Sequence, residues 1–389
     1  MILKQDCIHF PGDRPCLFHK QTGVICIDCK DYEPVGFRIL IIKLDAAGDV
    51  LRTTSILTGL MEKYPHAHIT WVTLKDSTEI FDNNGLVDRV LSFDSTESIA
   101  HLAVEQFSLL INLDTSPKSA SLASYCHSDD KLGYGLDKHG KVFCFNKEAE
   151  TWFEMGAFDH IKKRNTRTYQ SLMLEICRLQ PREFEIVLNL TAGELARAKD
   201  FARSHGIDQS YPVIGMNTGA SPRWEQKKWT LEGYQELIGR IMNETSYTVI
   251  LYGGKHERER NRELAGIDRK RVIDANTEKS LRDFFSLLSL SDVIITGDTL
   301  ALHAATALKK RVIAIFGPTS AAEIETYGRV RKVQSETVEC RCYYRPVCTE
   351  EINCMNTIPA EKIFNLVKEE VGKLSVGRKT SALTGVQPH

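Results

Sequence analysis

The sequence lacks an excess of charge of either sign, and it lacks any long apolar run. Its 389 residues include 50 Lys and Arg against 51 Asp and Glu, a formal net charge of -1, so it has no overall basic character of the kind that marks nucleic-acid-binding proteins. No apolar stretch is long enough to cross a bilayer, and residues 1–9 lack the apolar segment of a secretory signal. We therefore expect a cytoplasmic protein that at most touches the inner face of the cytoplasmic membrane.

Two common nucleotide-binding signatures are absent as well. No G-x-G-x-x-G follows the first strand expected in either half of the chain, which argues against a nicotinamide-binding Rossmann domain. The phosphate loop G-x-x-x-x-G-K-[S/T] is also absent from the sequence. A nucleotide would therefore be held by loops of another kind.

What the sequence does contain is a regular alternation of strand and helix patterns. In the first half, short β-rich runs separated by amphipathic helical patterns lie at residues 38–44, 68–74, 89–93 and 109–114. After a break around residues 180–211, the β-rich runs resume at residues 213–217, 248–252, 272–274, 293–296 and 312–316. Such alternation predicts parallel sheets of βαβ units, and hence two α/β domains that face each other across a cleft. Ligands of such sheets bind at the carboxyl ends of the strands.

The composition changes at both ends of the chain. The first 35 residues are rich in Cys and His and show no periodicity, whereas Pro359 opens an amphipathic helix that we place at residues 359–374. Residues 375–389 are polar, and we predict a disordered tail there. The predicted organisation is a Cys-rich extension (1–35), an N-terminal Rossmann-like domain (36–185), a C-terminal Rossmann-like domain (186–358), the helix and the tail.

Charged side chains gather where the predicted strands end. In RILIIKLDAAGDVLRTTSIL, residues 38–57, a buried strand turns into a helix, and Asp45 and Asp49 lie at the turn. Asp49 either caps the helix or serves chemistry in the cleft. Asp45 is interpreted as part of the loop structure.

The C-terminal half has three such loops, of which the first is followed by lysines and the second by a carboxylate. The loop NTGAS, residues 217–221, is followed by Lys227 and Lys228. A small polar loop with a lysine can hold a diphosphate, although both lysines could equally be solvated. Glu257 lies in the first helical turn after a glycine pair, where a carboxylate can accept from both hydroxyls of a ribose or simply be favoured by the helix dipole.

The third loop places an acid and a hydroxyl at the start of a helix. Gly297, Asp298 and Thr299 end a buried strand, and His303 follows on the helix, where it could equally be a packing residue. The helix N-terminus offers unpaired N–H groups to an anion. With the turn FGPT at residues 316–319, the loops together predict a site for a nucleotide diphosphate.

These segments resemble the ADP-heptose:lipopolysaccharide heptosyltransferases, glycosyltransferase family nine, which have the GT-B fold. The likeness runs from about residue 38 to about residue 371, with the motifs in one order and at family-like spacing. The motifs lie at residues 41–57, 216–221, 227–229, 253–257, 297–308 and 316–319. The resemblance implies inverting transfer of a heptose from ADP-heptose to an acceptor of the lipopolysaccharide-core type, without a metal in the chemistry.

The resemblance also assigns roles to single residues. Asp49 matches the catalytic base that takes the proton of the acceptor hydroxyl, and Lys227 matches a group that stabilises charge on the departing diphosphate. Glu257 matches the carboxylate that holds the adenosine ribose. The other donor-binding positions that the resemblance implies are Thr218, Gly219, Asp298, Thr299 and His303.

The sequence does not identify the donor sugar or the acceptor. Leu300 stands where the family often has glycine, and Ser320 stands where it often has an acidic residue. Arg52 and the basic run KKRNTR, residues 162–167, suit a phosphorylated glycolipid acceptor at the inner membrane, or are simply solvated. Rival interpretations are another nucleotide sugar, a protein acceptor, a GT-B-like nucleotide-sugar epimerase and a non-catalytic binding module. The sequence does not indicate the oligomeric state.

The cysteines form two groups and a remainder. The first group, interpreted as a structural zinc site with an iron–sulfur cluster or free thiols as alternatives, is Cys7, Cys16, Cys26 and Cys29. The second, interpreted as a structural pin or a second metal site, is Cys340, Cys342, Cys348 and Cys354. The remainder, interpreted as small buried hydrophobic residues, are Cys126, Cys144 and Cys177.

Overall fold

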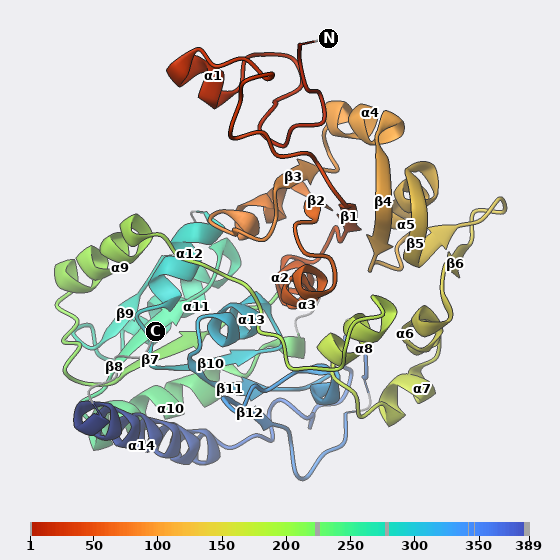
Figure 1. The fold of residues 1–389 in the computed structure, drawn as a ribbon. Helices are drawn as coiled ribbons and strands as arrows, with labels where there is room; N and C mark the ends of the chain where they lie inside the picture. The colour runs from red at the N-terminus through yellow and green to blue at the C-terminus, as the bar shows by residue number, and fades with distance from the viewer. Residues whose placement is uncertain (1, 222–225, 277–279, 341, 346, 385–389) are drawn as a thin grey trace.

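Two six-stranded sheets, one in each half of the chain, organise the molecule (Figure 1). The computed structural model describes residues 2–221, 226–276, 280–340, 342–345 and 347–384, with side chains to residue 374. Helices pack on the faces of each sheet, so the chain forms two Rossmann-like domains that face each other, as the alternation predicts.

The N-terminal sheet has the strand order β3-β2-β1-β4-β5-β6. All neighbours pair in parallel except β5 and β6, which are antiparallel. Its strands are β1 (Arg38–Ile42), β2 (His68–Thr73), β3 (Arg89–Ser92), β4 (Gln106–Asn112), β5 (His127–Leu136) and β6 (Val142–Cys144). The helices of this half are α2 (Ala47–Thr53), α3 (Ile56–Lys63), η1 (Lys75–Phe81), α4 (Thr96–Val104), α5 (Pro117–Tyr125), η2 (Lys147–Ala149), α6 (Glu150–Ala157), α7 (Asp159–Arg164) and α8 (Tyr169–Ile176).

The C-terminal sheet has the order β12-β11-β10-β7-β8-β9 and is parallel throughout its described pairings. Its strands are β7 (Val213–Asn217), β8 (Thr248–Tyr252), β9 (Val272–Asp274), β10 (Val293–Gly297), β11 (Arg311–Ile315) and β12 (Val330–Val333). Its helices are α9 (Ala192–Ser204), α10 (Leu231–Glu244), η4 (Lys255–Glu257), α11 (Arg258–Ala265), α12 (Leu281–Leu288), α13 (Leu300–Ala307) and η5 (Ala321–Glu323).

The sequence predicts β1 to β4 and β7 to β11, which include the edge strands β3 and β9. The residues of β7, β8 and β10 are all buried, because helices cover both faces of a parallel sheet and leave continuous apolar runs. The sequence does not predict β5, β6 and β12. Strand β5 carries Asp129, Asp130 and Lys131, and β12 exposes Arg331 and Lys332, so these strands near the sheet edges lack an apolar run.

The starts of two helices bring the domains together. Helix α2 of the N-terminal domain packs against α13 of the C-terminal domain. A Cβ added to Gly48 would lie 3.2 Å from the His303 ring and 3.4 Å from the backbone of Leu300, so a residue without a side chain permits this approach. The loop after β1 therefore faces the loop after β10 at the carboxyl edges of both sheets.

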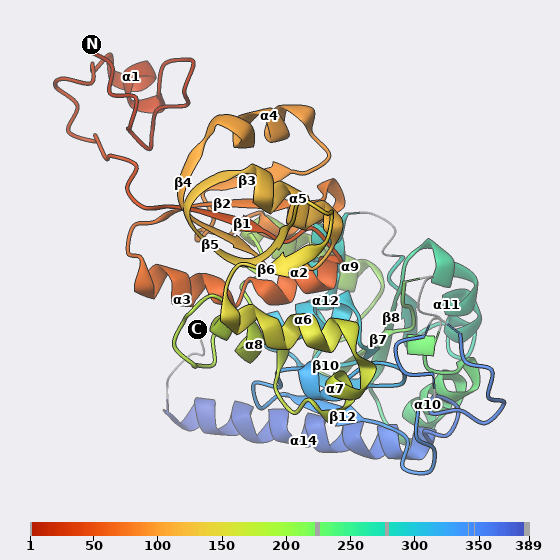
Figure 2. The ribbon, with the colours of Figure 1, turned by 90° about the vertical axis from the view of Figure 1, so that its right-hand side faces the viewer.

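The C-terminal helix α14 (Ala360–Thr384) packs on the second domain (Figure 2). Its apolar residues Ile363, Phe364, Val367 and Val371 join the core on the α10 face of the sheet, as the amphipathic pattern predicts. The predicted end at residue 374 is too early, because the backbone stays helical to Thr384 through a stretch without proline. Residues 385–389 of the predicted tail lie outside the described residues.

The Cys-rich extension projects from the N-terminal domain, away from the second domain (Figures 1 and 2). It contains one short helix, α1 (Leu17–Thr22), and a β-bridge between Cys7 and Pro34. Phe37 anchors the start of the first domain, with its ring stacked on Tyr64 at 4.4 Å between centroids. Among the helices of the described residues, none is long and apolar enough to cross a membrane.

Candidate active site

A polar cavity of about 750 Å³ lies between the two domains at the carboxyl edges of the sheets. It collects residues from the loop after β1, from helices α6 and α7, and from the loops after β7, β8, β10 and β11. Seven of the predicted site residues line the cavity: Asp49, Gly219, Lys227, Glu257, Asp298, Thr299 and His303. The structure therefore brings together residues that are 254 positions apart in the sequence, from Asp49 to His303, and leaves out Thr218.

Asp49 lies in the first turn of α2 without capping it. The N-cap residue is Ala46, which makes no side-chain cap bond, so the capping interpretation of Asp49 is wrong. The Asp49 carboxylate pairs with Arg52 at 2.7 Å, and its side chain remains 37% exposed to the cavity. Asp45 is exposed and is not among the residues that line the cavity, in agreement with its interpretation as loop structure.

Cations on the N-terminal domain keep Asp49 ionised. Burial favours the neutral acid, but Arg52 and Lys43 outweigh it and hold the pKa of Asp49 below its usual value. The Arg52 guanidinium stacks on the Tyr169 ring at 3.7 Å from the centroid, and Lys43 forms a buried ion pair with Asp114. The sequence does not single out Lys43, which follows β1 and pairs with Asp114 after β4, or Tyr169, which the fold brings beside Arg52 from α8.

On the opposite wall, Lys227 and Asp298 form an ion pair. The Lys227 Nζ donates to the Asp298 carboxylate at 3.0 Å and to its carbonyl oxygen at 3.1 Å. A Cβ at Gly297 would lie 2.5 Å from the Lys227 carbonyl oxygen, so the glycine at this strand end lets the lysine segment approach. Burial opposes ionisation of Asp298, yet Lys227 with help from His303 and Arg52 lowers its pKa to about 2.

His303 stands as a neutral ring between the two walls. Burial, assisted by the nearby Arg52 charge, lowers the pKa of His303 to about 4. The residue is 5% exposed and lies on α13, whose N-cap is Thr299. The Thr299 hydroxyl lies within hydrogen-bonding distance of Thr296 at 3.0 Å and of Asn217 at 3.3 Å. Thr299, Leu300 and Ala301, at the start of α13, line the cavity.

Thr218 does not occupy the position that the resemblance implies. The residue is 1% exposed, its hydroxyl donates to Asn261 at 2.6 Å, and its N–H donates to the Tyr252 carbonyl oxygen at 3.1 Å. The hydroxyl therefore points into the protein rather than toward a diphosphate. Gly219 and Ser221 line the cavity instead.

Glu257 lies under the same loop and is held by backbone groups. Its Oε2 accepts from the Gly254 N–H at 3.0 Å, and its Oε1 lies 3.1 Å from the Lys228 ammonium nitrogen. A Cβ at Gly219 would lie 2.5 Å from the Glu257 carboxyl carbon, so the loop closes over this side chain only with glycine there. Lys228 is thus engaged with Glu257, whereas Lys227 faces Asp298.

One wall of the cavity combines Lys162, from the basic run that the sequence singles out, with residues that the sequence does not single out. Lys162 of the basic run lies 3.7 Å from the Tyr344 ring centroid and 3.6 Å from Glu323, and Trp152 lines the cavity beside it. Burial lowers the pKa of Lys162 and raises that of Glu323. Arg167, at the end of the run, instead pairs with Glu175 at the surface.

All eleven cysteines are described and are free thiols. The first group lines a second cavity, of about 500 Å³, inside the extension and away from the active site. The second group lines a cavity of about 350 Å³, where the sulfur atoms of Cys340 and Cys342 lie 3.7 Å apart. Within the described ranges, no three Cys, His, Asp or Glu side chains form a group that could hold one metal ion. Cys126 and Cys177 are buried as predicted, whereas Cys144 is partly exposed.

Two Rossmann-like domains whose carboxyl edges meet at one polar cavity define the GT-B class of glycosyltransferase. The family model "Glycosyltransferase family 9 (heptosyltransferase)" matches residues 97–352, and the chain belongs to this family. It is therefore a glycosyltransferase enzyme.

Individual relatives agree with this assignment. Lipopolysaccharide heptosyltransferase 1 of Salmonella typhimurium is 25% identical over 314 residues, which cover 75% of this chain and 92% of that protein. The solved glycosyl transferase family 9 structure from Veillonella parvula matches with a TM-score of 0.70 at 17% identity, covering 87% of this chain and 98% of that one. E. coli heptosyltransferase WaaC with ADP-2-deoxy-2-fluoro heptose matches with a TM-score of 0.57 at 20% identity, covering 86% and 99%.

Proposed function

We propose that this enzyme transfers a heptose from ADP-heptose to an acceptor of the lipopolysaccharide-core type, with inversion at the anomeric carbon. The observation that carries the proposal is an ionised carboxylate, Asp49, on one wall of the interdomain cavity, opposite the lysine and helix N-terminus of the other wall. Relatives named for lipopolysaccharide heptose transfer, and a solved relative with an ADP-heptose analogue, support the choice of donor.

Asp49 serves as the general base. The acceptor hydroxyl gives its proton to the carboxylate as its oxygen attacks the anomeric carbon, on the face opposite the departing ADP. Arg52, 2.7 Å from the carboxylate, fixes its direction and keeps it ionised. Because the attack comes from the face opposite the leaving group, the product has the inverted configuration.

The C-terminal wall takes the charge that ADP gains as it leaves. Lys227 is a cation at the cavity, and the first N–H groups of α13 point to the same space, so both stabilise the developing charge on the β-phosphate. Asp298 positions the Lys227 ammonium through two hydrogen bonds. These protein groups supply the charge stabilisation, and we propose that no metal takes part in the transfer.

Glu257 and the loop of Gly219 hold the nucleoside. A carboxylate whose Oε2 is fixed by the Gly254 N–H keeps its Oε1 at a buried position next to Lys228, where it can accept from a ribose hydroxyl. We place the acceptor on the other wall, between Arg52 and Lys162. A glycolipid acceptor would be reached from the inner face of the cytoplasmic membrane, where we place the protein.

Binding and product analysis test the proposal. ADP, UDP, GDP and ADP-heptose are compared by calorimetry, and the product formed from ADP-heptose is examined by NMR for its anomeric configuration. We expect selective binding of the two ADP compounds and a product of inverted configuration. A preference for UDP or GDP would refute ADP-heptose as the donor. A product of retained configuration would refute the role of Asp49 as a base acting on the acceptor.

A further inference from the structure

The Cys-rich extension has no hydrophobic core of its own. Among residues 2–35, all of which are described, none is buried, and large apolar side chains such as Ile2, Leu17 and Ile27 are 57%, 65% and 65% exposed. Segments of fewer than about 40 residues seldom fold on a hydrophobic core alone and usually need disulfides, a metal or a partner. The described conformation of this extension must therefore be stabilised by something other than buried apolar area.

The contacts within the extension are weak ones. The Lys4 ammonium lies 3.6 Å from the Tyr32 ring centroid, and the Tyr32 hydroxyl donates to Asp6 at 2.8 Å. Both are surface interactions, which contribute little to stability. With the backbone hydrogen bonds of the turns and the His9–Phe18 ring contact, they still leave the extension without a buried residue to offset its conformational entropy.

Four thiols from three separate parts of the extension line one cavity. Cys7 forms the bridge with Pro34, Cys16 is the N-cap of α1, and Cys26 and Cys29 flank the turn closed by the Asp28 N–H and the Ile25 carbonyl oxygen. All four line the cavity of about 500 Å³. Four cysteine sulfurs are the ligand set of closed structural zinc sites and of iron centres bound by thiolates.

Hydrogen bonds to nearby backbone groups orient two of the side chains that line this cavity, Cys16 and His19. The Cys16 sulfur accepts the His19 N–H at 3.5 Å, which helps to fix the direction of this side chain. The Nδ1 of His19 bonds to the Val24 carbonyl oxygen at 2.9 Å, so its ring is held at the wall of the same cavity. Backbone bonds of this kind orient the ligands and their neighbours at metal centres.

We propose that the extension binds one zinc or iron centre through Cys7, Cys16, Cys26 and Cys29, and that this binding orders residues 2–35. In the described conformation the four cysteines line one cavity, and no three Cys, His, Asp or Glu side chains among the described residues form a group that could hold one ion. Binding draws the sulfurs together, each thiol gives its proton to solvent, and the metal–sulfur bonds take the place of a hydrophobic core. The site is structural, since it lies outside the interdomain cavity.

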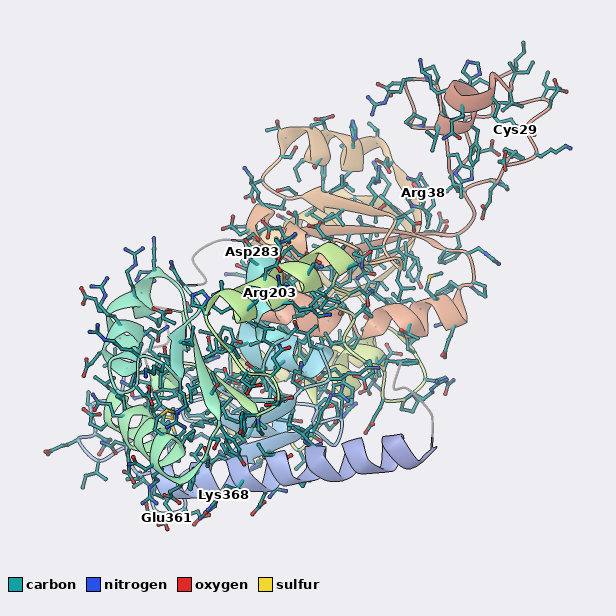
Figure 3. All side chains as sticks on the ribbon, turned by 90° about the vertical axis from the view of Figure 1, so that its left-hand side faces the viewer. Cys29, Arg38, Arg203, Asp283, Glu361 and Lys368 are labelled. Atoms are coloured by element: carbon teal, nitrogen blue, oxygen red, sulfur yellow. The ribbon has the colours of Figure 1, made fainter. Side chains whose placement is uncertain are left out.

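The position of Cys29 allows this site to be tested apart from the active site. In Figure 3 the labelled Cys29 lies in the extension beyond Arg38, the first residue of β1, and away from the interdomain region. A change at the metal should therefore leave nucleotide binding intact. ADP affinity becomes an internal control for folding of the two domains.

The experiment measures zinc and iron in the full-length chain, purified under reducing conditions, by elemental analysis and absorbance. We expect a stoichiometric metal that is lost in Cys26→Ser/Cys29→Ser and kept in the matched variant Cys342→Ser/Cys348→Ser. Wild type and both variants should bind ADP alike. Equal metal content in all three proteins, or loss only in the Cys342/Cys348 variant, would overturn the proposal.

A second measurement does not depend on a variant. The wild-type chain is stripped with a chelator and titrated with Co²⁺, whose thiolate charge-transfer bands report sulfur ligands, while limited proteolysis follows cleavage within residues 2–35. We expect faster cleavage after stripping and protection when Co²⁺ or Zn²⁺ returns. Unchanged cleavage, or disulfides among these four cysteines in non-reducing mass spectrometry, would refute a metal-ordered extension.

Discussion

Replacement of the proposed base is the sharpest test of the active site. Asp49→Asn keeps the size and the contact with Arg52 at 2.7 Å but removes the group that accepts a proton. Loss of a general base costs about 10²- to 10⁴-fold in rate, which corresponds to about 3–5 kcal/mol of transition-state stabilisation. ADP affinity should hardly change, because Lys227 and Glu257 lie on the opposite domain.

The assay is release of ADP from ADP-heptose with acceptor present, with kcat and KM measured separately. Asp45→Asn is the matched control, since Asp45 is exposed four positions away and does not line the cavity. We expect full activity in that variant. Retention of more than about a tenth of kcat in Asp49→Asn, or an equal loss in Asp45→Asn, would refute the reasoning.

The same residue sets the acid side of the pH profile. A base works when deprotonated, and the pKa of Asp49 is below its usual value, so kcat/KM should stay level in mildly acid solution and fall only at low pH. Removal of a neighbouring cation in Arg52→Gln raises that pKa, and the acid limb should move to higher pH. A limb that does not move would show that another group titrates there.

Three further changes give distinct outcomes. Lys227→Ala should weaken ADP binding by more than about tenfold in calorimetry, because a charge-assisted contact to phosphate contributes about 1.5–3 kcal/mol. Thr218→Val should leave ADP affinity unchanged and lower the free energy of unfolding by about 1–3 kcal/mol, because its hydroxyl serves the buried Asn261. Arg282→Leu should destabilise the fold by about 3–5 kcal/mol in denaturant, since it leaves Glu194 buried without its partner.

The Glu194 pair also predicts an effect of pH on stability. Hydrogen bonds from Arg282, against the opposing effect of burial, lower the pKa of Glu194 to about 2 from a usual 4.5. A depressed carboxyl pKa stabilises the fold above the unfolded value and loses that effect as pH falls toward 2. The control is the exposed ion pair between Arg203, labelled in Figure 3, and Asp200. Arg203→Leu should change the free energy of unfolding by less than about 1 kcal/mol at any of these pH values. Equal losses in the two variants would contradict this assignment.

Local sequence was sufficient for the elements that are buried on both faces. The strands predicted at residues 213–217 and 248–252 agree with β7 and β8, whose residues are all buried, because a parallel strand between two helix layers is largely apolar. The strand predicted at residues 272–274 agrees with β9, which lies at the edge of the sheet. The site residues were indicated by the resemblance of the loop motifs to the family. Seven of these eight residues line the cavity, Thr218 being the exception.

Tertiary structure alone decided the direction of individual side chains and the partners they meet. Thr218 and Ser221 lie in one loop, yet the fold turns the first inward to Asn261 and leaves the second at the cavity. Spacing cannot reveal this, because a loop has no fixed period that assigns each side chain to a face.

For a related reason, the local sequence does not reveal the cavity wall around Lys162, where we place the acceptor. Trp152, Lys162, Glu323 and Tyr344 come from four segments of both domains and meet only where the sheets face each other. Of the four, only Lys162 lies in a segment that the sequence singles out, the basic run at residues 162–167, and burial gives Lys162 and Glu323 their altered pKa values. The sequence determined which residues end the strands, and the packing of one domain on the other determined which of them share a site.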